Sequence, residues 1–61
     1  MPLIQVKLYD SRVTEESTPK IVKALTDALC SVTSEEIRPH VWVIVEGVAP
    51  RNWGIAGEVA G

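Results

Sequence analysis

Residues 3–8, Leu-Ile-Gln-Val-Lys-Leu, decide the fold because they alternate strictly between the two sides of an extended chain. The odd-numbered positions are mixed in character, whereas the even-numbered positions, Ile4, Val6 and Leu8, are all apolar. A period of two is typical of a β-strand with one face drier than the other. The sequence therefore predicts a first strand here, with one face packed against the rest of the chain.

A second strand is predicted at residues 41–45, Val-Trp-Val-Ile-Val. A continuous run of bulky β-formers is typical of a strand that is buried on both faces. Residues 34–37 before it predict a turn or a short helical step, which Pro39 is expected to end. After it, residues 49–52 predict a turn, and the glycine-rich residues 53–61 a loose hairpin or arm.

Between the strands we expect an amphipathic helix that begins within residues 15–18 and ends near residue 31. Thr14 and Ser17 are both suitable N-caps. Because proline fits only the first turn of a helix, Pro19 predicts an irregular opening. Cys30 is expected beside the apolar stripe as a small filler. That stripe has three- and four-residue spacing and consists of Ile21, Leu25, Ala28, Leu29 and Val32.

Strand, helix, strand and arm in this order predict an α+β fold, built on a short βαβ unit. A helical crossover of about 20 residues favours parallel strands and a right-handed connection. One helix covers one face of the two-stranded sheet, so the other face and the edge are left bare in a monomer. We therefore expect residues 1–61 to form a single domain that is completed by oligomerisation.

The size of the chain also indicates oligomerisation. Below about 70–80 residues, a single core rarely supplies more than about 3–5 kcal/mol without reinforcement. The chain has 61 residues and only one cysteine, Cys30, so no intrachain disulfide can form. Cys30 and the one histidine, His40, are too few for a structural zinc site.

Composition excludes several classes of function. A net charge of −2 and a pI near 5.2 argue against a nucleic-acid partner. No apolar run approaches the roughly 18 residues that span a membrane, and the first residues lack the features of a signal peptide. A free cysteine fits a reducing compartment. We therefore expect a cytoplasmic protein with no membrane partner, no metal and no cofactor.

Pro2 is the leading candidate for chemistry. Aminopeptidases remove an initiator methionine when the next residue is small, which would leave Pro2 with a free secondary amine. An α-amino group has a pKa of about 7.7–8.0, and an apolar pocket lowers that pKa. Such an amine is an effective general base near neutral pH. If Met1 is retained, the Pro2 nitrogen becomes an amide and has no basic lone pair.

Two further features accompany Pro2. Arg12 lies just beyond the far end of the first strand, and the segment Asn52-Trp53-Gly54-Ile55-Ala56-Gly57-Glu58 opens the C-terminal arm. With "MPLIQVKL…SR…", then a helix, then "VWVIVEGVAPRNWGIAGE", the chain resembles the 4-oxalocrotonate tautomerase family along nearly its full length. The spacing from Pro2 to Arg12 and the segment around Trp53 are the most specific parts of this resemblance.

The resemblance implies an isomerase in which Pro2 moves a proton between carbons of a 2-hydroxydienoate or a related enol acid, giving a conjugated 2-oxo acid. It implies that Arg12 binds the far carboxylate end of the substrate. Trp53 would keep the proline pocket apolar, in place of the phenylalanine of the founding members. It also implies a homohexamer, a trimer of dimers with sites shared between subunits, or a mixed assembly with a related chain.

One position departs from the family pattern. The best-known tautomerases carry a second substrate-binding arginine at the start of the second strand, where this chain has Trp42. Arg38 and Arg51 are nearby in sequence, and either could reach the pocket. Loss of the arginine removes a charge-assisted contact worth about 1.5–3 kcal/mol, so the exact substrate does not follow from the resemblance.

Each candidate also has a plainer interpretation. Arg12 and Arg51 can be solvated charges, Trp42 can serve packing, and Trp53 can be an interface anchor. Two other functions stay open as well. The same Pro2 could act as a general acid in a hydratase or dehalogenase of unsaturated acids, or the chain could be a non-catalytic subunit that keeps the scaffold.

Overall fold

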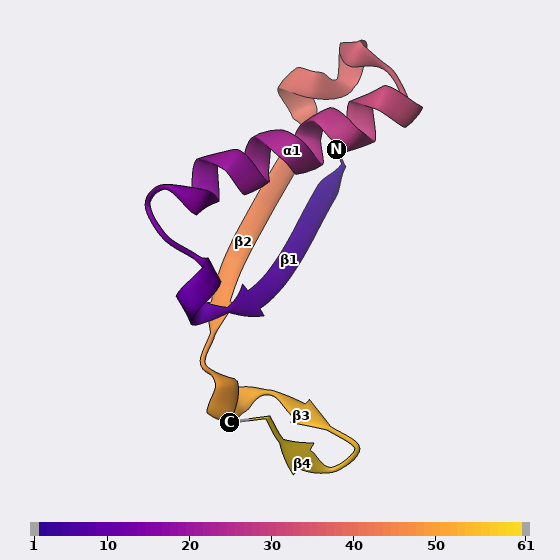
Figure 1. Ribbon diagram of the computed structural model, residues 1–61. Coiled ribbons are helices and arrows are strands. Elements are labelled where there is room, and N and C mark those ends of the chain that lie inside the picture. Colours follow the sequence, from indigo (N-terminus) through magenta and orange to yellow (C-terminus); the bar gives the residue numbers. More distant parts are fainter. Residues whose placement is uncertain (1, 61) are drawn as a thin grey trace.

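The computed structural model describes residues 2–60, and the order of its elements is the predicted one (Figure 1). Met1, on whose removal the proline chemistry depends, lies outside the described residues, as does Gly61. The strands and helices, with 3₁₀ helices marked η, are β1 (Leu3–Tyr9), η1 (Asp10–Arg12), α1 (Ser17–Val32), η2 (Glu35–His40), β2 (Trp42–Val48), η3 (Pro50–Asn52), β3 (Gly54–Ile55) and β4 (Glu58–Val59).

The two long strands form a parallel sheet. Leu3 lies opposite Trp42 at one end of the register, and Tyr9 lies opposite Val48 at the other. The α1 helix crosses both strands on one side of the sheet (Figure 1). The predicted α+β fold with a βαβ unit is therefore confirmed.

The predicted C-terminal hairpin is confirmed as well. Strands β3 and β4 pair antiparallel, and they project beyond the end of the sheet (Figure 1). Ala56 and Gly57 form the two-residue turn with φ values of 53° and 86°. Two positive φ angles are what a type I′ turn requires, and this turn matches the twist of a hairpin.

The sheet is covered on one face only. The even-numbered positions of β1, predicted to form its dry side, are half-buried, and the odd-numbered positions are exposed. The same alternation runs along β2, where Trp42 is 57% and Ile44 is 46% exposed. The prediction that the second strand is buried on both faces is thus wrong for the single chain, because one helix can cover only one face of the sheet.

Helix α1 begins with a reciprocal cap that uses both predicted capping residues. Ser17 N–H donates to Thr14 Oγ1 at 3.0 Å, and Thr14 N–H donates to Ser17 Oγ at 2.9 Å, as in a capping box. Pro19 lies in the first turn, where its missing N–H is tolerated. The Ser17 hydroxyl also donates to the Arg12 carbonyl oxygen at 2.7 Å, so the cap ties η1 to the helix.

The predicted apolar stripe of α1 is confirmed in part, because Ile21, Leu25 and Leu29 are half-buried. Cys30, expected beside the stripe, is 4% exposed and is the one buried residue among residues 2–60. Val32 and Ala28, expected within the stripe, are exposed, Val32 by 80%. Val32 is the last residue of α1, and this end of the helix extends past β1 (Figure 1). Val22 and Thr26 share the half-buried side with Cys30 at four-residue spacing.

Gly47 in β2 allows η1 to pack closely against the sheet. A β-carbon built on Gly47 would lie 3.1 Å from Asp10 Cα and 3.4 Å from Val13 Cβ. Only glycine leaves room for backbone at this distance. Gly47 and the Ser17 hydroxyl therefore fix together where Arg12 leaves the end of the sheet.

We expect Gly47→Ala to lower the free energy of unfolding by about 1–3 kcal/mol, as overpacking against backbone does. Gly54→Ala is the matched control, because the nearest atom to its added β-carbon would be 3.9 Å away. Urea unfolding of both variants at one protein concentration is the measurement. Equal losses in the two variants would show that the contact at Gly47 is not tight.

Candidate active site

Pro2 is fixed at the start of the sheet. Trp42 N–H donates to the Pro2 carbonyl oxygen at 3.0 Å, which extends the β1–β2 hydrogen bonding by one residue. Pro2 is half-buried. Its ring nitrogen therefore has a defined position beside the first residue of β2.

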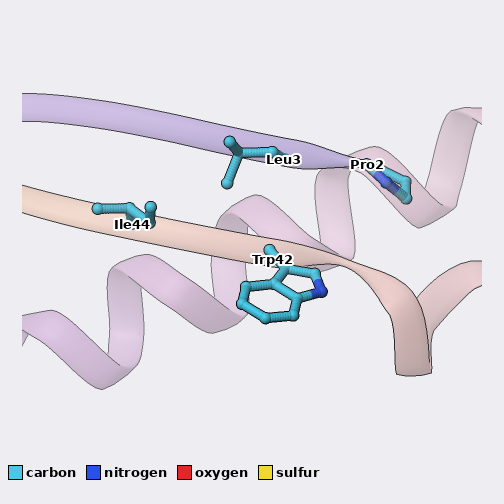
Figure 2. Close-up of a pocket in the computed structure, with 4 residues that line it drawn as sticks. All are labelled: Pro2, Leu3, Trp42 and Ile44. Carbon is cyan, nitrogen blue, oxygen red and sulfur yellow. The ribbon is translucent and has the colours of Figure 1, made fainter.

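An open hollow of about 330 Å³ lies next to this nitrogen, lined by Pro2, Leu3, Trp42 and Ile44. Figure 2 shows the four side chains at the neighbouring ends of β1 and β2, with the indole of Trp42 at the start of its strand. The lining is almost wholly apolar. The volume is within the range of about 300–1,000 Å³ that small-molecule sites occupy. Such surroundings disfavour the charged form of an amine.

Sequence reasoning selected Pro2 and Trp42 but missed Leu3 and Ile44. Leu3 lies directly opposite Trp42, and Ile44 follows on the same face of β2. The alternation of β1 combined with a parallel register was the available signal. It places these side chains together on the face opposite the helix.

Arg12, Arg51 and Trp53 lie at the other end of the sheet. Arg12 ends η1, just after β1, while Arg51 and Trp53 follow β2 (Figure 1). The six residue steps from Leu3 to Tyr9 span about 20 Å at the usual strand rise. The structure therefore brings Pro2 and Trp42 together within one chain but keeps them apart from the other three predicted site residues.

Trp53 is held over its own end of the sheet. Its ring packs edge-to-face on Tyr9, with ring centroids 5.2 Å apart and an interplanar angle of 77°. The indole Nε1–H donates to the Val48 carbonyl oxygen at 3.3 Å. Trp53 consequently does not line the hollow beside Pro2 of its own chain.

Arg38 lies at the Pro2 end, but its guanidinium is already occupied. Its Nε and Nη2 donate to the two carboxylate oxygens of Glu35 at 2.8 and 3.1 Å, and its Nη1 donates to Asp27 Oδ1 at 2.8 Å. These contacts clamp η2 to α1. Helix η2 runs to His40, so Pro39 lies inside this helical step and does not end it as predicted.

By contrast, the Arg12 and Arg51 side chains are exposed and form no ion pair with any residue in the range 2–60. Arg38 and Arg51 are the two possible substitutes for the second substrate-binding arginine. Of these, Arg51 is the one whose guanidinium forms no ion pair within residues 2–60. It lies, however, at the far end of its own sheet.

The clamp shifts the pKa of each of its members. Hydrogen bonds from Lys23 and then Arg38 lower the pKa of Asp27, and the hydrogen bond from Arg38 lowers the pKa of Glu35. The same carboxylates raise the pKa of Arg38. A carboxyl group with a lowered pKa in the folded state stabilises the fold above its unfolded pKa, and that contribution is lost as the pH falls through the folded pKa.

We therefore expect Arg38→Gln to lower the thermal midpoint at pH 7, with a deficit that shrinks as the pH falls below the ordinary carboxyl values of 4.5 for Glu35 and 3.8 for Asp27. Thermal unfolding between pH 3 and pH 7 measures this. Lys20→Gln, on an exposed position of α1, controls for the lost charge. A deficit that is the same at both ends of the pH range would mean that the carboxylates are not its source.

Within residues 2–60, no group of three or more His, Cys, Asp or Glu side chains is placed to hold a metal ion. No helix in the same range is both long enough and apolar enough to cross a bilayer.

Comparison with known proteins gives one family and a consistent fold. The model of a family described as "Tautomerase enzyme" matches residues 2–61. The chain is similar to the crystal structure of SAR1376 from methicillin-resistant Staphylococcus aureus, described as a candidate 4-oxalocrotonate tautomerase. The identity is 30%, the TM-score is 0.83, and the match covers 97% of this chain and 92% of that one. It shares its fold with DmpI from Helicobacter pylori at 24% identity and a TM-score of 0.83, over 97% of this chain and 90% of that one. No curated protein sequence matches the chain.

Proposed function

Because the chain belongs to the tautomerase family, we propose that it is an isomerase that tautomerises a small enol or 2-oxo acid, with Pro2 as general base once Met1 is removed. The observation that carries this proposal is the apolar hollow directly beside Pro2, whose backbone is fixed by the hydrogen bond from Trp42. A secondary amine in such surroundings favours its neutral, proton-accepting form.

The proposed reaction is a proton transfer that balances within the substrate. The Pro2 nitrogen accepts the proton of the enol hydroxyl, and the electron pair of that O–H bond becomes the second bond of the new carbonyl. The electron pair of the carbon–carbon double bond then takes up a proton at carbon from the protonated proline. The base is regenerated, and the reaction consumes no co-reactant.

We propose that Arg12 of a second copy binds the substrate carboxylate. Within one chain, about 20 Å of strand separates the Pro2 end of the sheet from the Arg12 end, which a small enol acid cannot bridge. Trp53, and in second place Arg51, would reach the same site from a neighbouring copy. These residues are consistent with a shared site because η1, η3 and the hairpin all lie at the outer end of the sheet (Figure 1).

Exposed apolar residues supply the surfaces for this assembly. The hairpin carries Ile55 and Val59, which are 68% and 66% exposed, and Tyr9, on the uncovered sheet face beyond the residues that line the hollow, is 39% exposed. Apolar surface of this extent on so small a chain is typical of an interface. We propose a homohexamer, a trimer of dimers; a mixed assembly with a related chain would use the same surfaces.

We expect Pro2→Ala to lower kcat/KM for ketonisation of 2-hydroxymuconate or phenylenolpyruvate by about 10²- to 10⁴-fold, the usual contribution of a positioned base. The protein must be free of Met1, as shown by intact mass, and the variant must keep the assembly size of the parent. Equal rates for the parent and the variant would end the proposal.

The pH profile separates a base from an acid. With Pro2 as base, kcat/KM rises with pH through the pKa of Pro2 and then levels off, because the neutral amine is the active form. A rate that falls through the same pKa would instead point to Pro2 as a general acid, as in hydration or dehalogenation of an unsaturated acid.

Subunit mixing tests the shared site. We expect Pro2→Ala and Arg12→Ala chains, each nearly inactive alone, to regain activity when they are unfolded and refolded together in equal amounts. Random assembly would leave about one site in four with both an intact Pro2 and an intact Arg12 from another copy. If Pro2 and Arg12 of the same chain formed the site, every site would lack one of them, and mixing would restore nothing.

A further inference from the structure

We infer that Trp42 makes this site selective for an enol acid with one carboxylate and an apolar aryl end, over an enol acid with two carboxylates. The inference rests on the proposed function of Pro2 and names the class of substrate that the hollow fits. It starts from the side chains that surround the position where the substrate must meet the base.

The wall that Trp42 provides is large, flat and unoccupied by the rest of the chain. Trp42 is 57% exposed, and it stands opposite Leu3 with Ile44 next to it on the same face. An indole ring binds another aromatic ring edge-to-face or offset-stacked, beyond the gain from area alone. An aryl group held there would bring the adjoining enol carbon to the side of the hollow where the Pro2 nitrogen lies.

A second carboxylate in the hollow would have no countercharge within the described chain. Arg38 is the nearest arginine in the fold, and its three donor nitrogens already face Glu35 and Asp27. Burial of an unpaired carboxylate in apolar surroundings is unfavourable. The lining that this chain supplies therefore disfavours a charged end as well as favouring an apolar one, whereas an Arg51 supplied by a neighbouring copy would oppose this preference.

The nearest lysine on this sheet face does not change that balance. Lys7 and Glu46 lie opposite each other on neighbouring strands, and Lys7 Nζ forms an ion pair with Glu46 Oε1 at 2.7 Å. Because this ion pair engages the Lys7 ammonium, Lys7 offers no free positive charge to a second carboxylate in the hollow. A substrate with a single carboxylate needs no such partner, because that carboxylate can be directed to Arg12 of a neighbouring copy.

The test compares kcat/KM for phenylenolpyruvate, an aryl monocarboxylate, with kcat/KM for 2-hydroxymuconate, a dicarboxylate, in Met1-free assembled protein. We expect the parent to prefer the aryl substrate by about tenfold or more, and Trp42→Phe to keep that preference within about threefold. Trp42→Arg should shift the ratio toward the dicarboxylate by about 10- to 100-fold, because a charge-assisted pair becomes available.

Val32→Arg is the matched control, because it adds the same charge at a position that is 80% exposed and does not line the hollow. It should leave the ratio of the two kcat/KM values unchanged. If Val32→Arg shifts the ratio as far as Trp42→Arg does, overall charge and not the hollow sets selectivity, and the inference is overturned.

Failure of the inference is distinct from failure of the proposed function. A parent that turns over the dicarboxylate equally well or better, with Pro2→Ala inactive on both, overturns the role of Trp42 and leaves the base in place. If neither enol is turned over, titration calorimetry with the unreactive acids 3-phenylpropanoate and adipate decides the question without any chemistry. Binding of 3-phenylpropanoate about tenfold tighter than adipate supports the inference, and equal or reversed affinities overturn it.

Discussion

The parallel pairing of β1 with β2, which starts at the hydrogen bond from Trp42 N–H to the Pro2 carbonyl oxygen, fixes both ends of the proposed site at once. It holds the Pro2 nitrogen beside an apolar hollow at one end of the sheet. Because the strands are parallel, it also sends η1, η3 and the hairpin to the opposite end. The amine and the guanidinium of Arg12 are therefore kept a strand's length apart in every single chain. Catalysis of the proposed kind then requires a second copy.

The same constraint governs stability. Among residues 2–60, Cys30 alone is buried, so the isolated chain has hardly any closed core. The helix covers one sheet face, and the other presents Leu3, Trp42 and Ile44 together. Contact with other copies around the hollow and along the hairpin would remove apolar surface from water, which is the main favourable term in association. In this account, assembly encloses the hollow with residues of other copies and leaves its interior to the substrate.

Much of the fold could be predicted from local sequence patterns. The alternation of residues 3–8, the reciprocal caps Thr14 and Ser17 and the glycines of the hairpin each determine their element through short-range physics. The features that could not be predicted depend on how elements meet. Val32, the last residue of α1, is exposed, and Cys30 is buried although it lies beside the expected stripe. The bulky run 41–45 indicates burial on both faces, but one chain has only one helix to cover it.

The residues of the candidate site also fall into those that local sequence patterns predict and those that depend on how the elements meet. Pro2 and Trp42 could be selected from position and residue type, whereas Leu3 and Ile44 required the strand register. The occupied state of Arg38 could not be read from sequence, because Asp27 is on a different element.

The most direct test of the account is a crystal structure of the assembled, Met1-free protein with a bound enol-acid analogue. The account predicts the Pro2 nitrogen next to the ligand, with the guanidinium of Arg12 from another copy on its carboxylate. It is contradicted if every Arg12 in the assembly lies about a full strand length, some 20 Å, from each Pro2 nitrogen.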